Sequence, residues 1–114
     1  MKYFSIDTLT PANLSKGDNT VLISYTASVA NTNDNPVALT FAVNGDINVA
    51  FVENGIEKSF VTWLETMTTV DISYQKEVTI RILNTPGSSP CSLTLTAKDI
   101  NHNPVDSPTS ITYA

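Results

Sequence analysis

The chain has 114 residues and a formal net charge of −5, with only six Lys and Arg residues. This length fits one domain with a single core, which we place at residues 1–114. Because the basic residues are few and scattered, the sequence argues against nucleic acid and anionic membrane surfaces as partners.

Alternating apolar residues predict the strands of the N-terminal half. After a first strand at residues 3–7, the clearest one covers residues 20–30, whose odd positions are expected to face the core. Turn-forming residues interrupt the pattern at 31–36, and alternation resumes at 37–43, so we expect these two strands to form a hairpin.

Two Asn-Gly pairs, at residues 44–45 and 54–55, predict tight hairpin turns, because Asn and Gly tolerate the positive φ angles that such turns need. A strand containing Ile47, Val49 and Phe51 lies between them. Three successive strands would then form an antiparallel meander, which excludes a parallel α/β fold.

Residues 56–71 are ambiguous, since their large apolar residues follow helical spacing while their Thr and Val content favours extended chain. We expect a strand at 58–64 and allow a short helix between 63 and 69. Further strands are expected at 77–83, 92–98 and 110–114, separated by loops at 84–90 and 99–108. About eight short strands in total predict an all-β fold, an immunoglobulin-like antiparallel β-sandwich of about 7–9 strands.

Two related turns follow alternating strands, Asn31-Thr-Asn-Asp-Asn-Pro-Val37 and Asp99-Ile-Asn-His-Asn-Pro-Val105. In an immunoglobulin-type sandwich they would be corresponding hairpins at the same end of the domain. The pattern resembles the hairpins of bacterial immunoglobulin-like repeats in invasin- and intimin-type adhesins, with Asp34 and His102 replacing the central Gly common in that family's turn. The resemblance implies an extracellular stalk or receptor-binding module of bacterial or phage origin.

These two loops are the predicted contact surface for a protein partner, because loops on a rigid sandwich often carry function. The candidate contact residues are Asn31, Asn33, Asp34, Asn35, Asp99, Asn101, His102 and Asn103.

One of the two loops also offers oxygen ligands of the kind that Ca²⁺ selects. They come from Asp99, Asn101, Asn103 and Asp106. The Gly and the bidentate Glu of an EF-hand loop are missing, so the pattern favours turns whose side chains bond their own backbone, and no cofactor is predicted.

Trp63 is the only Trp and the candidate ligand-binding aromatic residue. With Tyr74 and Tyr3 it would form a sugar-stacking platform in a carbohydrate-binding module, which is the alternative function. A lone Trp in a small domain more often fills the core, and this interpretation is favoured.

A hydrolase is the remote alternative. His102 is the only His and Cys91 the only Cys, and no Gly-x-Ser-x-Gly motif is present. Zinc requires more His and Cys residues than the chain has, and its four Gly residues form no phosphate-binding loop. The residues therefore predict no catalytic site and no bound metal.

The predicted function is a non-enzymatic protein-interaction or structural module, as in an adhesin, a virion or tail accessory, or a secretion-associated assembly. Self-association is expected through the terminal strands at 3–7 and 110–114, which carry few charges to repel a partner strand. The sequence shows neither a signal peptide nor an apolar stretch long enough to span a membrane, and leaves the compartment open.

Overall fold

The computed structural model describes residues 4–31, 35–84 and 91–113, and within them it contains strands, turns and bends but no helix. In this part of the chain no helix is long and apolar enough to cross a membrane. The ten described strands are β1 (Phe4–Thr10), β2 (Asn13–Leu14), β3 (Gly17–Ala27), β4 (Val37–Asn44), β5 (Val49–Glu53), β6 (Ile56–Lys58), β7 (Thr62–Glu65), β8 (Tyr74–Ile82), β9 (Ser92–Lys98) and β10 (Thr109–Tyr113). The predicted all-β class is confirmed, although the strands outnumber the expected eight because β2 and β6 are too short to show alternation.

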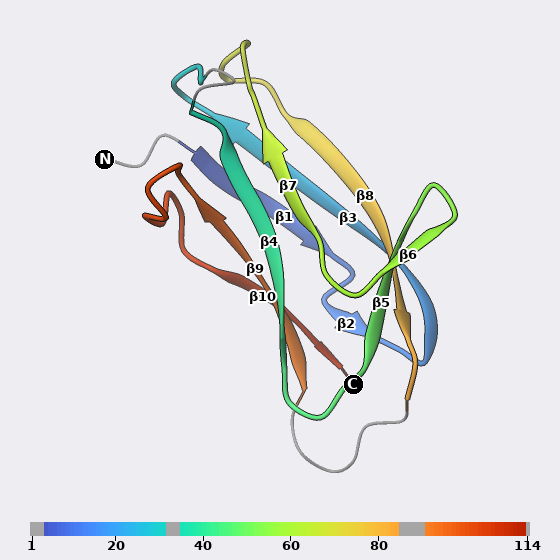
Figure 1. The fold of residues 1–114 in the computed structure, drawn as a ribbon. Helices are drawn as coiled ribbons and strands as arrows, with labels where there is room; N and C mark the ends of the chain where they lie inside the picture. Colours follow the sequence, from blue (N-terminus) through green and yellow to red (C-terminus); the bar gives the residue numbers. More distant parts are fainter. Residues whose placement is uncertain (1–3, 32–34, 85–90, 114) are drawn as a thin grey trace.

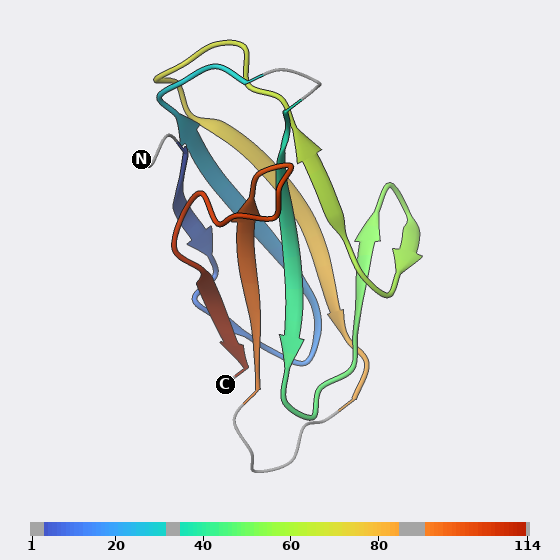
Figure 2. The same cartoon turned by 60° about the vertical axis from the view of Figure 1, so that its left-hand side comes forward.

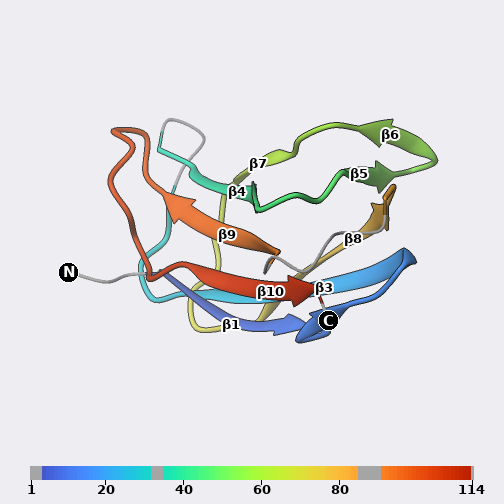
Figure 3. The same cartoon turned by 90° about the horizontal axis from the view of Figure 1, so that it is seen from below.

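Two five-stranded sheets form the fold, with strand orders β1-β3-β8-β5-β6 and β2-β10-β9-β4-β7. Figure 1 shows one sheet in front of the other, and Figure 3 gives the same arrangement seen from below. Their facing sides are lined by alternate residues of each strand, as the geometry of a pleated sheet requires. On β3 and β9, for example, these are Val21, Ile23 and Tyr25 of β3 and Leu93, Leu95 and Ala97 of β9, all buried in one apolar cluster.

The predicted hairpin of residues 20–30 and 37–43 is wrong. Strand β3 lies in the first sheet and β4 in the second, so the connecting segment crosses between the sheets. The expected tight hairpin at Asn44-Gly45 is wrong for the same reason, because β4 and β5 also belong to different sheets. Alternation indicates which side chains are buried, and it does not indicate which strand lies alongside.

The second Asn-Gly pair forms the predicted turn. Asn54 and Gly55 have φ angles of 52° and 78°, and Glu53 pairs directly with Ile56 across the two-residue turn. Positive φ at both central residues matches the twist of antiparallel strands. The hairpin of β5 and β6 projects from the side of the molecule beside β7 (Figure 2).

Residues 56–71 contain two short strands, β6 and β7, in place of the expected single strand at 58–64 and of the alternative helix. Of the residues at helical spacing, Trp63 and Met67 are buried whereas Ile56 and Phe60 are exposed, so the spacing does not mark one buried helical face. Val29, which was expected to face the core, is also exposed because β3 already ends at Ala27.

The chain's last strand is not an edge. Strand β10 lies between β9 and β2, and Thr112 and Tyr113 pair in parallel with Asn13 and Leu14. The Thr112 hydroxyl also donates to the Asn13 side chain, 3.0 Å away. The prediction that residues 110–114 offer a free edge is therefore wrong, while β1 is an edge strand as expected.

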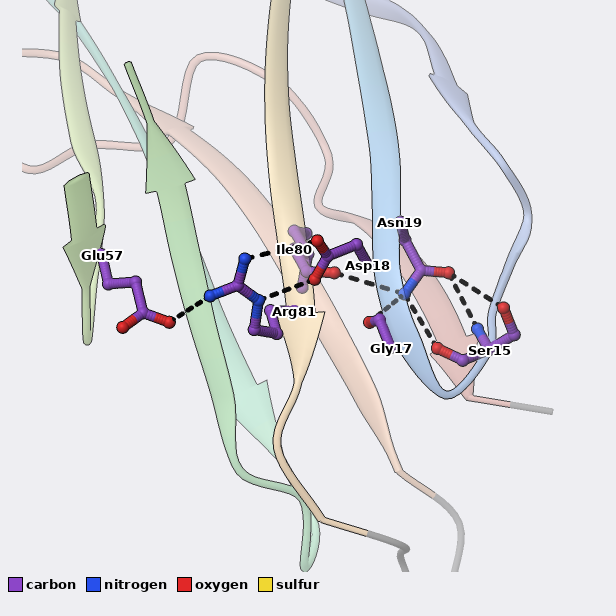
Figure 4. Close-up of polar contacts among 7 residues, drawn as sticks. All are labelled: Ser15, Gly17, Asp18, Asn19, Glu57, Ile80 and Arg81. Atoms are coloured by element: carbon purple, nitrogen blue, oxygen red, sulfur yellow. Dashed lines mark hydrogen bonds and ion pairs between the residues drawn. The ribbon is translucent and has the colours of Figure 1, made fainter. Parts of the chain in front are cut away.

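A polar network on the outer face of the first sheet fixes the projecting hairpin to its neighbours. Figure 4 shows the Arg81 guanidinium between Glu57 and Asp18, at 2.5 Å and 2.7 Å. Arg81 lies on β8, so this network links β3, β8 and β6. The hydrogen bond from Arg81 holds the pKa of Asp18 below its usual value, and the carboxylate stays charged in neutral solution.

Candidate functional site

The two Asn-rich loops lie at the same end of the sandwich, because Ala38 at the start of β4 pairs with Lys98 at the end of β9. Only the second loop joins adjacent strands, β9 and β10, so the two turns are not corresponding hairpins. Asn33 and Asp34 lie outside the described residues.

Asn31 is part of the folded interior, with 4% of its surface exposed. Its side-chain amide donates to the carbonyl oxygens of Asn35 and Glu65, at 3.2 Å and 2.9 Å. Its side-chain oxygen accepts from the Met67 N–H at 2.7 Å, and the two backbones are bonded as well. Asn31 therefore connects two loops and presents no polar group to a partner.

Asp99 organises the second loop. Its carboxylate accepts from the backbone N–H groups of Asn101 and Asn103, at 2.9 Å and 3.0 Å. His102 adopts a positive φ of 64°, and its N–H donates to the Asp99 carbonyl oxygen. This is the local turn chemistry that the sequence favoured over Ca²⁺.

The carboxylate of Asp106 is likewise bonded to backbone N–H groups. Its carboxylate accepts from the backbone N–H of Ile6 at 2.7 Å and from that of Ser107 at 2.8 Å. Within the described ranges there is no group of three or more His, Cys, Asp or Glu side chains arranged to hold a metal ion. At this end of the molecule, Asn35, Asn101, His102 and Asn103 remain exposed.

Trp63 lies on the inner face of β7 with 9% of its surface exposed. Its ring meets Phe41 edge-on at 6.1 Å between centroids, and the Lys76 ammonium lies 5.3 Å from the ring centroid. The indole N–H donates to the Glu53 carboxylate at 2.9 Å. The ring thus contacts Phe41 and Lys76, its N–H is bonded to Glu53, and its small exposed area offers little surface to a stacked sugar.

Tyr74 does not complete the expected platform, because its ring and its hydroxyl are engaged within the fold. Tyr74 stacks on Tyr25 at 5.7 Å, and its hydroxyl donates to the Thr69 carbonyl oxygen. Tyr3 lies outside the described residues. Burial and the nearby Glu65 raise the pKa of Tyr25 well above its usual value, so this phenol stays neutral.

Cys91 and His102 are far apart. Cys91 is buried directly before β9, and His102 follows the end of that strand. Seven residues of extended chain span about 23 Å at roughly 3.3 Å per residue, far beyond hydrogen-bond reach. The fold therefore does not bring the two residues together.

A pocket of about 390 Å³ opens between the β5–β6 hairpin and β7. We call it the β6–β7 pocket; its lining residues are Glu53, Lys58, Ser59, Phe60, Val61, Thr62 and Trp63. Lys58 pairs directly with Phe51, which is fully buried, so both side chains lie on the inner face of the hairpin. The pocket therefore lies on this inner face, next to the core. The Glu53 carboxylate lies 3.5 Å from the Lys58 ammonium and also accepts the Trp63 N–H.

Large apolar side chains surround this pocket on the exposed surface. Phe60 is 71% exposed, Leu64 on the outer face of β7 is 67% exposed, and Ile56 on β6 is 61% exposed. All three fall within nine consecutive residues, and both β6 and β7 are the last strands of their sheets. Exposed apolar groups concentrated at unpaired strands are characteristic of interaction surfaces.

Sequence reasoning placed the site at the loops and overlooked this side of the molecule. A signal was present in residues 60–64, where four of five residues are large and apolar and where Trp63 and Leu64 put apolar groups on both faces of β7. A strand with one solvated face should carry polar residues on it, so apolar residues on both faces indicate a second contact. The sequence matches no protein-family model, and no curated protein is significantly similar to it.

Proposed function

We propose that this chain is an immunoglobulin-like β-sandwich that acts as a non-enzymatic interaction module, binding an extended segment of a protein partner along β7 and the β6–β7 pocket. The strand orders support the immunoglobulin-like assignment. Strands β1-β3-β8-β5 correspond to A-B-E-D, and β10-β9-β4-β7 correspond to G-F-C-C′. Strands β6 and β7 are the edge strands at the D and C′ ends of the two sheets and lie on the same side of the sandwich (Figure 2), although along the chain the D-like strand β5 precedes the C′-like strand β7.

One observation carries the choice of surface: Phe60 and Leu64, both more than two-thirds exposed, lie next to a pocket and an unpaired strand edge. An extended peptide that joins a sheet edge gains backbone hydrogen bonds, and neighbouring pockets select its side chains. Aromatic residues at the centre of such a surface commonly contribute most of the binding energy.

The end of the sandwich that carries the two Asn-rich loops is less suited to binding a partner. The carboxylates of Asp99 and Asp106 and the amide of Asn31 are engaged by the chain's own backbone. A partner there would meet exposed amides and His102, with Ile100 as the exposed apolar residue in the same turn.

The test is selection of peptides from a displayed random library on the immobilised chain, followed by affinity measurement on two variants. We expect Phe60→Ser to weaken the selected peptides at least about tenfold, since aromatic anchors typically contribute more than 1.4 kcal/mol. Ile100→Ser, the matched control at the loop end, should leave the affinity unchanged. The opposite pattern would assign binding to the loops, and a glycan array probed with the same two variants tests the carbohydrate alternative.

A further inference from the structure

The described strands leave four sheet edges, at β1 and β6 in one sheet and at β2 and β7 in the other. Free edges invite pairing with another chain, and proteins usually protect them by shortness, charge, bulges or a covering loop.

Strand β1 is covered along part of its free side. The N–H of Ile6 donates to the Asp106 carboxylate, 2.7 Å away, so the loop before β10 caps this edge. The pairing of β1 with β3 is also irregular between Ile6 and Thr8, where an extra residue interrupts the register. A bulge and a covering loop both oppose the addition of a strand.

Strands β2 and β6 are protected by length and charge. Strand β2 has two residues and β6 has three. On β6, Glu57 is held by Arg81 and Lys58 is exposed, so an approaching strand would meet both charges.

Strand β7 is also short, but it has neither a bulge nor a charged side chain on its outer face. Its four residues, Thr62–Glu65, pair in regular register with β4. The outward side chains are Thr62 and Leu64, and the one charged residue, Glu65, is on the inner face in an ion pair with Lys76 at 2.9 Å. Among the described edges, β7 therefore combines regular backbone with an apolar, uncharged outer face.

We propose that β7 pairs antiparallel with β7 of a second copy of this chain, about a two-fold axis centred on Leu64. The inference rests on the proposed function and names the partner segment. A two-fold axis perpendicular to the sheet keeps the outer faces continuous and sets Leu64 opposite Leu64 of the second copy. Side chains directly opposite each other on one face of a sheet are in contact, so the two Leu64 side chains would bury each other. Leu64 is the most exposed large apolar side chain of β7.

The local charges favour a second copy at this place. The net charge of −5 opposes association over most of the surface. Beside β7, however, the charges occur as the pairs Glu53–Lys58 and Glu65–Lys76, which cancel. Two copies meeting edge to edge at β7 therefore bring together neutral surfaces.

The size of the contact sets the expected affinity. Four residues give only a few backbone hydrogen bonds, and Leu64 and Phe60 supply the apolar area, so this interface is smaller than the ~1,200 Å² typical of stable complexes. Association is accordingly weak and depends on concentration.

The first experiment is light scattering on a sizing column over a concentration series into the millimolar range. We expect the mass of the wild-type chain to rise from 12.3 kDa toward twice that value. Leu64→Lys should weaken association at least about tenfold, because it opposes two like charges at the axis. Ile100→Lys adds the same charge at an equally apolar exposed site away from β7 and should leave association unchanged.

The second experiment tests the register by cysteine cross-linking, using Leu64→Cys and Thr62→Cys. The axis at Leu64 predicts rapid disulfide formation between two copies of Leu64→Cys, whereas residue 62 faces residue 66 of the other copy and should cross-link slowly. The native Cys91 is buried and does not compete.

A chain that stays at monomer mass throughout the series, or that associates equally well with Leu64→Lys, would overturn the proposal. So would equal cross-linking at residues 62 and 64. The peptide selection separates this failure from failure of the proposed function, because binding of displayed peptides at Phe60 does not require a dimer. A monomeric chain that still binds peptides at Phe60 refutes only the second copy as partner.

Discussion

Replacing Asn31 by Ala tests whether this residue, first considered as a contact for a partner, is a structural link between loops. The substitution removes three hydrogen bonds of the side chain, to Asn35, Glu65 and Met67. Each such bond contributes about 1 kcal/mol net, and the buried partners are left without their bond, so we expect a loss of about 3 kcal/mol in the free energy of unfolding. This is a large share of the roughly 5–15 kcal/mol that stabilises a typical domain.

Urea denaturation followed by circular dichroism measures this loss. With a slope of about 2 kcal/mol per molar urea, the midpoint should fall by about 1.5 M. Asn101→Ala is the matched control, since it makes the same change at an exposed side chain of the other loop. The Met67 amide should also exchange its hydrogen faster in Asn31→Ala, because its acceptor is lost. If the two variants unfold within about 0.3 M of each other, Asn31 does not link the loops as described.

Two further predictions concern charge and burial. The pKa of Asp18 is lowered in the folded state by its hydrogen bond to Arg81, so this pair contributes stability above the usual carboxyl pKa and loses it as the pH falls through the acidic range. Urea midpoints measured between about pH 6 and pH 2.5 should therefore depend less steeply on pH in Arg81→Gln than in the wild type, and parallel curves would contradict the pair's role. Trp63 emission should be blue-shifted and weakly quenched by iodide in the native state, because its ring is packed against Phe41 and Lys76; quenching equal to that of the unfolded chain would show that the ring is exposed.

The sequence correctly located the strands that are regular and have one buried face, because their apolar residues alternate. Ile23 on β3 was correctly assigned to the core, because it lies in a long run of alternating residues. Which strands are neighbours was not accessible in this way. The two Asn-Gly pairs illustrate the limit: the pair at 54–55 closes a hairpin, while after Gly45 the chain crosses to the other sheet. Both sites place a Gly at positive φ, with 92° at Gly45 and 78° at Gly55, so the local conformation alone does not distinguish a hairpin from a crossing.

The candidate site was harder to predict, because a polar side chain can contact a partner only if the fold does not already use it in an internal hydrogen bond. Asp99 was correctly expected to bond its own backbone, since Asp in a turn does so without help from distant residues. The role of Asn31 depends on Glu65 and Met67, which are more than thirty positions away in the sequence. Phe60 is exposed because it lies between the projecting β5–β6 hairpin and β7; the apolar residues at 60–64 indicate a second contact there, but they do not reveal this path of the chain.

Amide hydrogen exchange of the wild-type chain, with and without the tightest peptide from the selection, tests whether the chain binds a protein segment along the side formed by β6 and β7. We expect slower exchange confined to residues 56–65 when the peptide is bound, because pairing at the β7 edge occupies backbone groups there. Protection of residues 99–104 in place of 56–65 would contradict the account and return the binding surface to the loops.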